Sequence, residues 1–219
     1  MNFNFDIFLE KQKEKNYFKN LISKLEKIGY ENIFPKKEEI FFAYQNFDFN
    51  NLKIIIIGQD PYPTKGVANG LAFSTSRTNL KTPASLKNIF KEIKNSYPKS
   101  QFLTNDLSYW KNQGVLLINN ILTVEESLPL AHKNMGWENF TYEFLKKITK
   151  TTKNIIFLVM GNYALNVLKK IDLNNHFVYI VSHPSPLSCN KNFLGSDVFK
   201  KINNKLRELN KKEIDWNTK

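Results

Sequence analysis

The sequence contains very little cysteine, histidine or arginine. Cys189 is the only cysteine in 219 residues, so no disulfide can form within the chain. The three histidines, His132, His176 and His183, do not occur at the paired spacings that zinc ligands have. We therefore expect a protein that holds no metal and no cofactor.

Long apolar segments are absent as well. No run of about 18 or more apolar residues is available to span a membrane. The N-terminal segment MNFNFDIFLEKQKEK carries acidic residues and lacks the apolar core of a secretory leader. We expect a cytoplasmic protein that makes no membrane contact.

Positive charge, in contrast, is abundant. The formal net charge is +12, which favours a polyanionic partner because neutralising phosphates releases counterions. Nearly all of this charge is lysine, with Arg77 and Arg207 as the only arginines, whereas bidentate reading of guanine edges usually uses arginine. The composition favours sequence-independent contact with a nucleic-acid backbone. A biased genome composition explains the many lysine, asparagine, isoleucine and phenylalanine residues equally well.

The order of apolar patterns predicts an α/β protein. Apolar residues at helical spacing indicate two helices in the N-terminal third, over 5–29 and 35–47. Four short apolar runs then have the character of buried parallel strands, at 52–57, 114–118, 155–160 and 177–181. Helical segments alternate with them, at 84–95, 137–149, 163–170 and 196–209. We expect a three-layer α/β/α fold with a central four-stranded, mostly parallel sheet, in a single domain covering residues 1–219.

Polar residues follow each predicted strand and should meet at one edge of the sheet. Asp60 follows the first strand, Asn119 the second and His183 the fourth. Taken singly, Asp60 before Pro61 is also typical of a turn, and Asn119 of a helix cap. Because ligands bind beyond the carboxyl ends of such strands, the convergence of a carboxylate, an amide and an imidazole there favours an active site.

Five motifs make the resemblance to a known family specific. GQDPYP, GLAFS, LLINNILTVE, GWENFT and HPSPLS occur in this order between residues 52 and 188. Together they resemble the uracil-DNA glycosylase family. The resemblance implies a monomeric base-excision repair enzyme that flips uracil out of single- or double-stranded DNA and hydrolyses its N-glycosidic bond, leaving an abasic site. It implies uracil-containing DNA as the partner and leaves open a DNA-mimicking protein inhibitor.

By this resemblance, two residues carry the chemistry. Asp60 would orient the attacking water and oppose positive charge on the sugar, and His183 would donate a hydrogen bond to uracil O2. Asn119 would read the uracil edge, Phe73 would stack on the base, and Tyr62 would exclude the thymine methyl. Gln59 would contribute main-chain contacts and loop shape to the same pocket.

The resemblance also implies a DNA-contacting surface. Leu187 would enter the base stack as an apolar wedge. The residues expected to grip the flanking backbone are Ser85, Pro184, Ser185 and Ser188, with Ser182 beside them. His132 would have a supporting role near the water site.

Two positions depart from the family pattern. Pro63 stands where the first motif usually has histidine, and we expect it to alter the shape of the water-site loop without abolishing activity. After HPSPLS the family commonly has an arginine, which is missing here, so Lys191 is expected to anchor phosphate instead.

Three other functions compete with this interpretation. A glycosylase of the same fold that prefers mismatched thymine or another damaged base is disfavoured by Tyr62 and Asn119. A non-catalytic DNA-binding or replication accessory protein would not need Asp60 beside polyanionic DNA. A nucleoside or nucleotide hydrolase fits the architecture alone, but the sequence has no P-loop or dinucleotide-type glycine motif.

Overall fold

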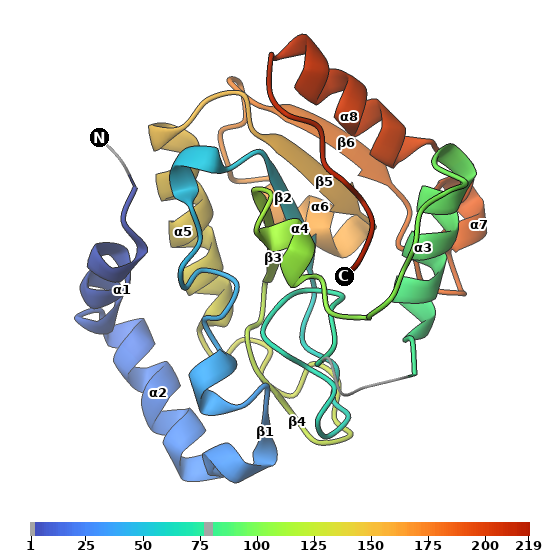
Figure 1. Ribbon diagram of the computed structural model, residues 1–219. Helices are drawn as coiled ribbons and strands as arrows, with labels where there is room; N and C mark the ends of the chain where they lie inside the picture. The colour runs from blue at the N-terminus through green and yellow to red at the C-terminus, as the bar shows by residue number, and fades with distance from the viewer. Residues whose placement is uncertain (1–2, 77–80) are drawn as a thin grey trace.

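The computed structural model describes residues 3–76 and 81–219, which form a central sheet between two helical layers (Figure 1). The sheet contains β2 (Ile54–Gly58), β3 (Val115–Asn119), β5 (Ile156–Met160) and β6 (Phe177–Val181). Their order is β3-β2-β5-β6, and every neighbouring pair is parallel. All residues of β2, β3 and β5 are buried, as expected for strands covered on both faces. The predicted three-layer α/β/α fold is confirmed.

The helices that alternate with these strands also match the sequence prediction closely. They are α3 (Ala84–Ser96), α5 (Trp137–Thr151), α6 (Asn162–Leu168) and α8 (Val198–Glu208). Two short helices, α4 (Ser108–Lys111) and α7 (Cys189–Asn192), were not predicted. Helices α3 and α8 lie on one side of the sheet, with α5 on the other (Figure 1).

The N-terminal third differs from the prediction. The segment 5–29 is not one helix but two, α1 (Phe5–Lys13) and α2 (Asn16–Ile28), which pack with α5. The predicted helix over 35–47 is wrong: a 3₁₀ turn at Lys37–Glu39 is followed by further turns, mostly closed by hydrogen bonds between residues three apart. These turns still bury Ile40, Tyr44 and Phe47, so the apolar spacing typical of a helix is present without a regular α-helix.

The N-terminal layer is held by aromatic contacts to α5. Phe140, which is fully buried, packs edge-on against Phe8 and Tyr44, with ring centroids 5.6 and 5.9 Å apart. The Phe5 and Tyr44 rings stack at 4.7 Å. Many of the abundant phenylalanines therefore belong to the core.

A second, very small sheet was not predicted. In it, β1 (Ile33–Phe34) pairs antiparallel with β4 (Val124–Glu125). Strands of this length carry no periodic pattern. They connect the N-terminal layer to the loop that follows β3. Between residues 3 and 76 and between 81 and 219, no helix has the length and apolar character required to cross a membrane.

Candidate active site

A cavity of about 210 Å³ lies at the carboxyl ends of β2 and β3. Its lining includes the predicted site residues Gln59, Asp60, Tyr62, Phe73, Ser85, Asn119 and His183. These residues come from segments far apart in the sequence and meet where the parallel strands end. The structure thus brings the predicted carboxylate, amide and imidazole into one pocket.

The Asp60 carboxylate is held by hydrogen bonds to both of its oxygens. The backbone N–H of Leu130 donates to Oδ2 at 2.7 Å, and Nε2 of Gln59 donates to Oδ1 at 3.1 Å. The predicted pocket residue Gln59 therefore also positions its neighbour through its side chain. Leu130 is a functional position that sequence reasoning missed, because it acts through a backbone group that leaves no side-chain signal.

Asn119 lies at the end of β3, directly opposite Gly58 in the parallel pairing with β2. Its side chain is buried, with 8% exposed, and a Cβ atom at position 58 would lie 2.2 Å from its Oδ1. Glycine at this position makes room for the amide. Across residues 3–76 and 81–219, the side chain of Asn119 makes no hydrogen bond, so its donor and acceptor both remain available to a ligand.

His183 has its tautomer defined by the loop that follows it. The backbone N–H of Ser185 donates to Nδ1 at 3.1 Å, so in the neutral ring the proton resides on Nε2. Burial lowers the pKa of His183 below its ordinary value, which favours the neutral ring. Gly161 lies against this residue, and a Cβ there would be 2.9 Å from the Cβ of His183.

Two aromatic residues form another part of the cavity wall. The Phe73 ring centroid lies 6.0 Å from that of His183, and Phe73 has a positive φ of 64°. The hydroxyl of Tyr62 donates to the carbonyl of Phe73 at 3.1 Å. Burial raises the pKa of Tyr62, so the phenol is neutral. These contacts fix the relative positions of the two rings.

The loop after β6 is braced from within and exposes one apolar side chain. The Ser188 hydroxyl donates to the carbonyl of His183 at 2.9 Å and lies 3.0 Å from the Ser185 hydroxyl, while the Ser182 hydroxyl donates to the carbonyl of Ser188 at 2.8 Å. Leu187 is 94% exposed. A leucine so exposed on a braced loop is available to a partner molecule.

The remaining predicted DNA-contacting residues lie within this loop or beside it. Pro184 is buried, and its carbonyl accepts a hydrogen bond from Nδ2 of Asn88 in α3 at 2.8 Å. Ser85 lies in the first turn of α3 and lines the cavity. Lys191 is exposed on α7. The loop and the start of α3 therefore lie together at the mouth of the pocket.

His132 is fully buried and does not line the cavity. Its Nδ1 lies 2.7 Å from the Thr123 hydroxyl, which accepts from Nε1 of Trp137 at 2.6 Å, and its Nε2 lies 3.4 Å from Oε1 of Glu125. Burial lowers the pKa of His132, opposed by the carboxylate of Glu125. Because His132 follows Leu130 by two residues, this buried network anchors the loop that holds Asp60.

Pro63 lines the cavity, and its carbonyl accepts a hydrogen bond from the backbone N–H of Ser127 at 2.8 Å. The proline therefore joins the loop after β2 to the loop that carries Leu130.

Comparison with known proteins identifies the family. The model of the uracil DNA glycosylase superfamily matches residues 45–207. The uracil-DNA glycosylase of Mycoplasmopsis pulmonis is 48% identical over 212 residues, covering 96% of this chain and 95% of the relative. The chain belongs to the uracil DNA glycosylase superfamily.

Solved structures of the same superfamily share the fold. The crystal structure of mimivirus uracil-DNA glycosylase matches with a TM-score of 0.90 and 29% identity, covering 98% of this chain and 86% of that one. A mimivirus UNG variant in complex with UGI matches with a TM-score of 0.90 and 28% identity, covering 98% and 87%. Both matches cover 98% of this chain, so the shared fold extends over nearly its whole length.

Proposed function

We propose that this protein is a DNA base-excision repair enzyme that flips uracil out of DNA and hydrolyses its N-glycosidic bond. The observation that carries the proposal is the convergence of Asp60, Asn119 and His183 on one cavity, beside the exposed Leu187. The products are free uracil and an abasic site. We also propose that it acts as a single-domain monomer in the cytoplasm.

Recognition of uracil requires complementary hydrogen bonds and a steric limit at C5. The amide of Asn119 can accept from uracil N3–H while donating to O4, whereas cytosine presents the opposite pattern on that edge. Phe73 offers an aromatic face on which a flipped base can stack. Tyr62, held through its hydroxyl by the carbonyl of Phe73, provides a wall against the thymine methyl.

Cleavage leaves positive charge on the sugar and negative charge on the departing uracil. Asp60, oriented by Leu130 and Gln59, would position water and oppose the cationic sugar. The neutral His183 would donate from Nε2 to uracil O2 as negative charge develops there. His132 would support the reaction indirectly, by anchoring the loop that carries Leu130.

Binding of DNA would use the mouth of the pocket. Leu187 would replace the extruded base in the stack, at an unstacking cost of about a few kcal/mol that binding must offset. Ser85, Pro184, Ser185 and Ser188 would contact the flanking backbone, where small groups approach phosphates closely. Lys191 would add charge at the same edge. A DNA-mimicking protein inhibitor would compete for this surface.

The experiment is a cleavage assay on an oligonucleotide with one uracil, beside an identical thymine control, with EDTA present and alkali added to break abasic sites. We expect scission with uracil only, abolished in the combined Asp60→Asn and His183→Ala variant. A matched Lys147→Gln variant, altered at an exposed position on α5, should retain full activity. Absence of scission in the unaltered protein would favour the alternative, a non-catalytic DNA-binding or replication accessory protein.

A further inference from the structure

A second cavity, of about 350 Å³, lies at the amino ends of the strands, on the opposite edge of the sheet from the active site. It is lined by Asn50, Asn51, Leu52, Lys53, Asn112, Gln113, Lys211 and Lys212. Lys53 immediately precedes β2, whereas the active-site cavity begins at Gly58, where β2 ends. The whole length of β2 therefore separates the two cavities.

Lys53 is an unusual residue to find at this position, because only 7% of it is exposed. Lysine is almost never fully buried unless it is paired. Its backbone is fixed in the sheet, with its N–H donating to the carbonyl of Gly114 and its carbonyl accepting from Ile156, both at 2.9 Å. Across residues 3–76 and 81–219, its ammonium group makes no hydrogen bond or ion pair. Lys53 thus lines the cavity with little exposed surface and with an ammonium group that has no protein partner among the described residues.

The other charged residues of the cavity are cations too. Burial lowers the pKa of Lys53, and Lys212 and Lys211 lower it further by repulsion. Nζ of Lys211 donates to the carbonyl of Asn154 at 2.8 Å, a contact that holds its ammonium in place without neutralising it. Lys212 is exposed. Partial burial and mutual repulsion of these ammonium groups destabilise the folded protein, and a bound anion would offset both effects.

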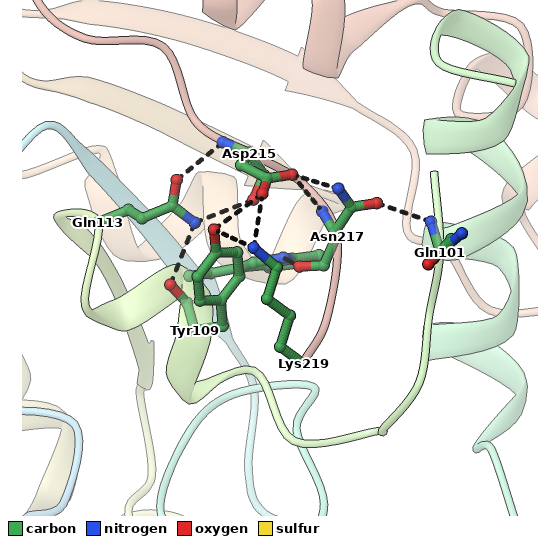
Figure 2. A network of polar contacts seen from close by, with 7 residues as sticks. Gln101, Tyr109, Gln113, Asp215, Asn217 and Lys219 are labelled. Carbon is green, nitrogen blue, oxygen red and sulfur yellow. Dashed lines mark hydrogen bonds and ion pairs between the residues drawn. The ribbon is translucent and has the colours of Figure 1, made fainter. Parts of the chain in front are cut away.

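The carboxylates of the neighbouring C-terminal segment interact with other residues, as Figure 2 shows for Asp215. Asp215 accepts from the Tyr109 hydroxyl at 2.8 Å and from Nδ2 of Asn217 at 2.6 Å, and lies 3.4 Å from Nζ of Lys219. Glu213 pairs with Arg207 at 3.1 Å. Neither side chain lines the cavity.

Gln113 forms a fixed part of the wall. Its Nε2 donates to the carbonyls of Tyr109 and Asp215, at 3.1 and 2.9 Å, and its Oε1 accepts from the backbone N–H of Asp215 at 2.8 Å (Figure 2). The same contacts tie the C-terminal segment, and with it Lys211 and Lys212, to the region around Lys53. The cavity therefore has a braced wall.

We propose that this cavity binds a phosphate-bearing anion, with the ammonium groups of Lys53, Lys211 and Lys212 supplying the positive charge. Phosphate oxygens accept hydrogen bonds from several ammonium groups at once, and lysine is a common phosphate ligand. The amides of Asn50, Asn51 and Asn112 line the same space and add donors. A cavity of about 350 Å³ has room for a small anion beside Lys53.

The test is a calorimetric titration at pH 7 and constant ionic strength. Inorganic phosphate, tripolyphosphate and a deoxynucleoside triphosphate serve as separate probes, and the last two carry the same number of phosphates. We expect saturable one-to-one binding, weakened at least about tenfold in the Lys211→Gln/Lys212→Gln variant. Lys53→Met should weaken it similarly, and because Lys211 and Lys212 lie outside the core, their variant remains informative if Lys53→Met does not fold. The matched control is Lys147→Gln/Lys150→Gln, which removes two exposed charges from α5.

The probes and variants separate the outcomes. Tighter binding of the deoxynucleoside triphosphate than of tripolyphosphate, lost in the Lys211→Gln/Lys212→Gln variant, identifies a nucleotide as the source of the phosphate. Binding of tripolyphosphate that is equal or tighter identifies the free anion. Equal weakening in the Lys147→Gln/Lys150→Gln control overturns the proposal, as does the absence of saturable binding. Binding that survives the lysine substitutions but is lost in Ser85→Ala/Ser185→Ala places the anion at the DNA-binding edge and also overturns it. Uracil excision should be unchanged in the Lys211→Gln/Lys212→Gln variant, so failure of this proposal is distinct from failure of the proposed function.

Discussion

The backbone N–H of Ser185 donates a hydrogen bond to Nδ1 of His183 at 3.1 Å. This contact assigns the single proton of the neutral ring to Nε2, the nitrogen that is left to act as a donor. A second proton on Nδ1 would face the N–H of Ser185 and break the contact. Loop geometry and burial therefore both favour the neutral imidazole.

A first prediction concerns the pH dependence of catalysis. Because burial lowers the pKa of His183 below its ordinary value, the ring is neutral at pH 7. As the pH falls through that lower pKa, Nδ1 takes up a second proton, and the contact with the N–H of Ser185 that orients the ring is lost. We expect kcat to decline at acidic pH with a midpoint below 6.5, the ordinary pKa of histidine. Nitrogen-15 NMR should show a protonated Nε2 and an unprotonated Nδ1 at pH 7. A cationic ring at pH 7 would contradict the assignment.

A second prediction separates the backbone of Leu130 from its side chain. Leu130 has a positive φ of 63° and holds Asp60 through its N–H alone. Asparagine tolerates this conformation and keeps the N–H. We expect Leu130→Asn to retain kcat within about threefold, whereas Asp60→Asn should lower it by about a hundredfold or more. A loss in Leu130→Asn as large as that in Asp60→Asn would show that the leucine side chain is required.

The sequence predicted the sheet and the composition of the pocket because both depend on local patterns. The apolar runs that became β2, β3, β5 and β6 are long enough to distinguish from loops, and parallel strands necessarily deliver Asp60, Asn119 and His183 to one edge. The roles of these residues came from the family motifs. Family membership is now shown by the comparisons, while each residue's role stays a prediction.

The features that were missed depend on contacts without a sequence pattern. Successive turns over 35–47 bury the same apolar spacing as a helix, so periodicity could not distinguish them. Leu130 acts through its main chain, and its side chain gives no indication of this. The sequence does not distinguish Lys53 from the other lysines, because only the folded chain brings it into one cavity with Lys211 and Lys212.

A third prediction tests the fit between Gly58 and Asn119. A Cβ at position 58 would lie 2.2 Å from Oδ1 of Asn119 and 3.0 Å from Cβ of Ala72. The amide must then move, so we expect Gly58→Ala to lower kcat/KM for uracil by about a hundredfold and to lower Tm. In an Asn119→Ala background, most of the Tm loss should disappear, because the shared contact is gone. Additive Tm losses would indicate that Ala72, and not Asn119, opposes the added methyl.

A fourth prediction concerns stability at alkaline pH. Lys111 is buried, its Nζ donates to the carbonyl of Gln45 at 2.8 Å, and burial lowers its pKa to about 8. Between this value and the ordinary lysine pKa of 10.5, the unfolded chain holds a proton that the folded chain has lost, so the contribution of Lys111 to the free energy of unfolding rises with pH. Urea unfolding should show the protein gaining stability relative to Lys111→Met from pH 8 to pH 10. A constant difference would mean that Lys111 keeps its proton in the fold.

The last prediction concerns the exposed Leu187. Since 94% of this side chain is exposed, replacing it removes little packing, and Leu187→Ala should leave Tm unchanged. A uracil in duplex DNA must be unpaired and unstacked before cleavage, whereas one in single-stranded DNA needs less help. We therefore expect Leu187→Ala to lower kcat/KM about tenfold or more on duplex DNA and much less on single strands. Leu103→Ala removes an apolar side chain that is 75% exposed on another segment, and it should change neither value. An equal loss on both substrates would mean that Leu187 contributes to binding in general and not to extrusion of the base.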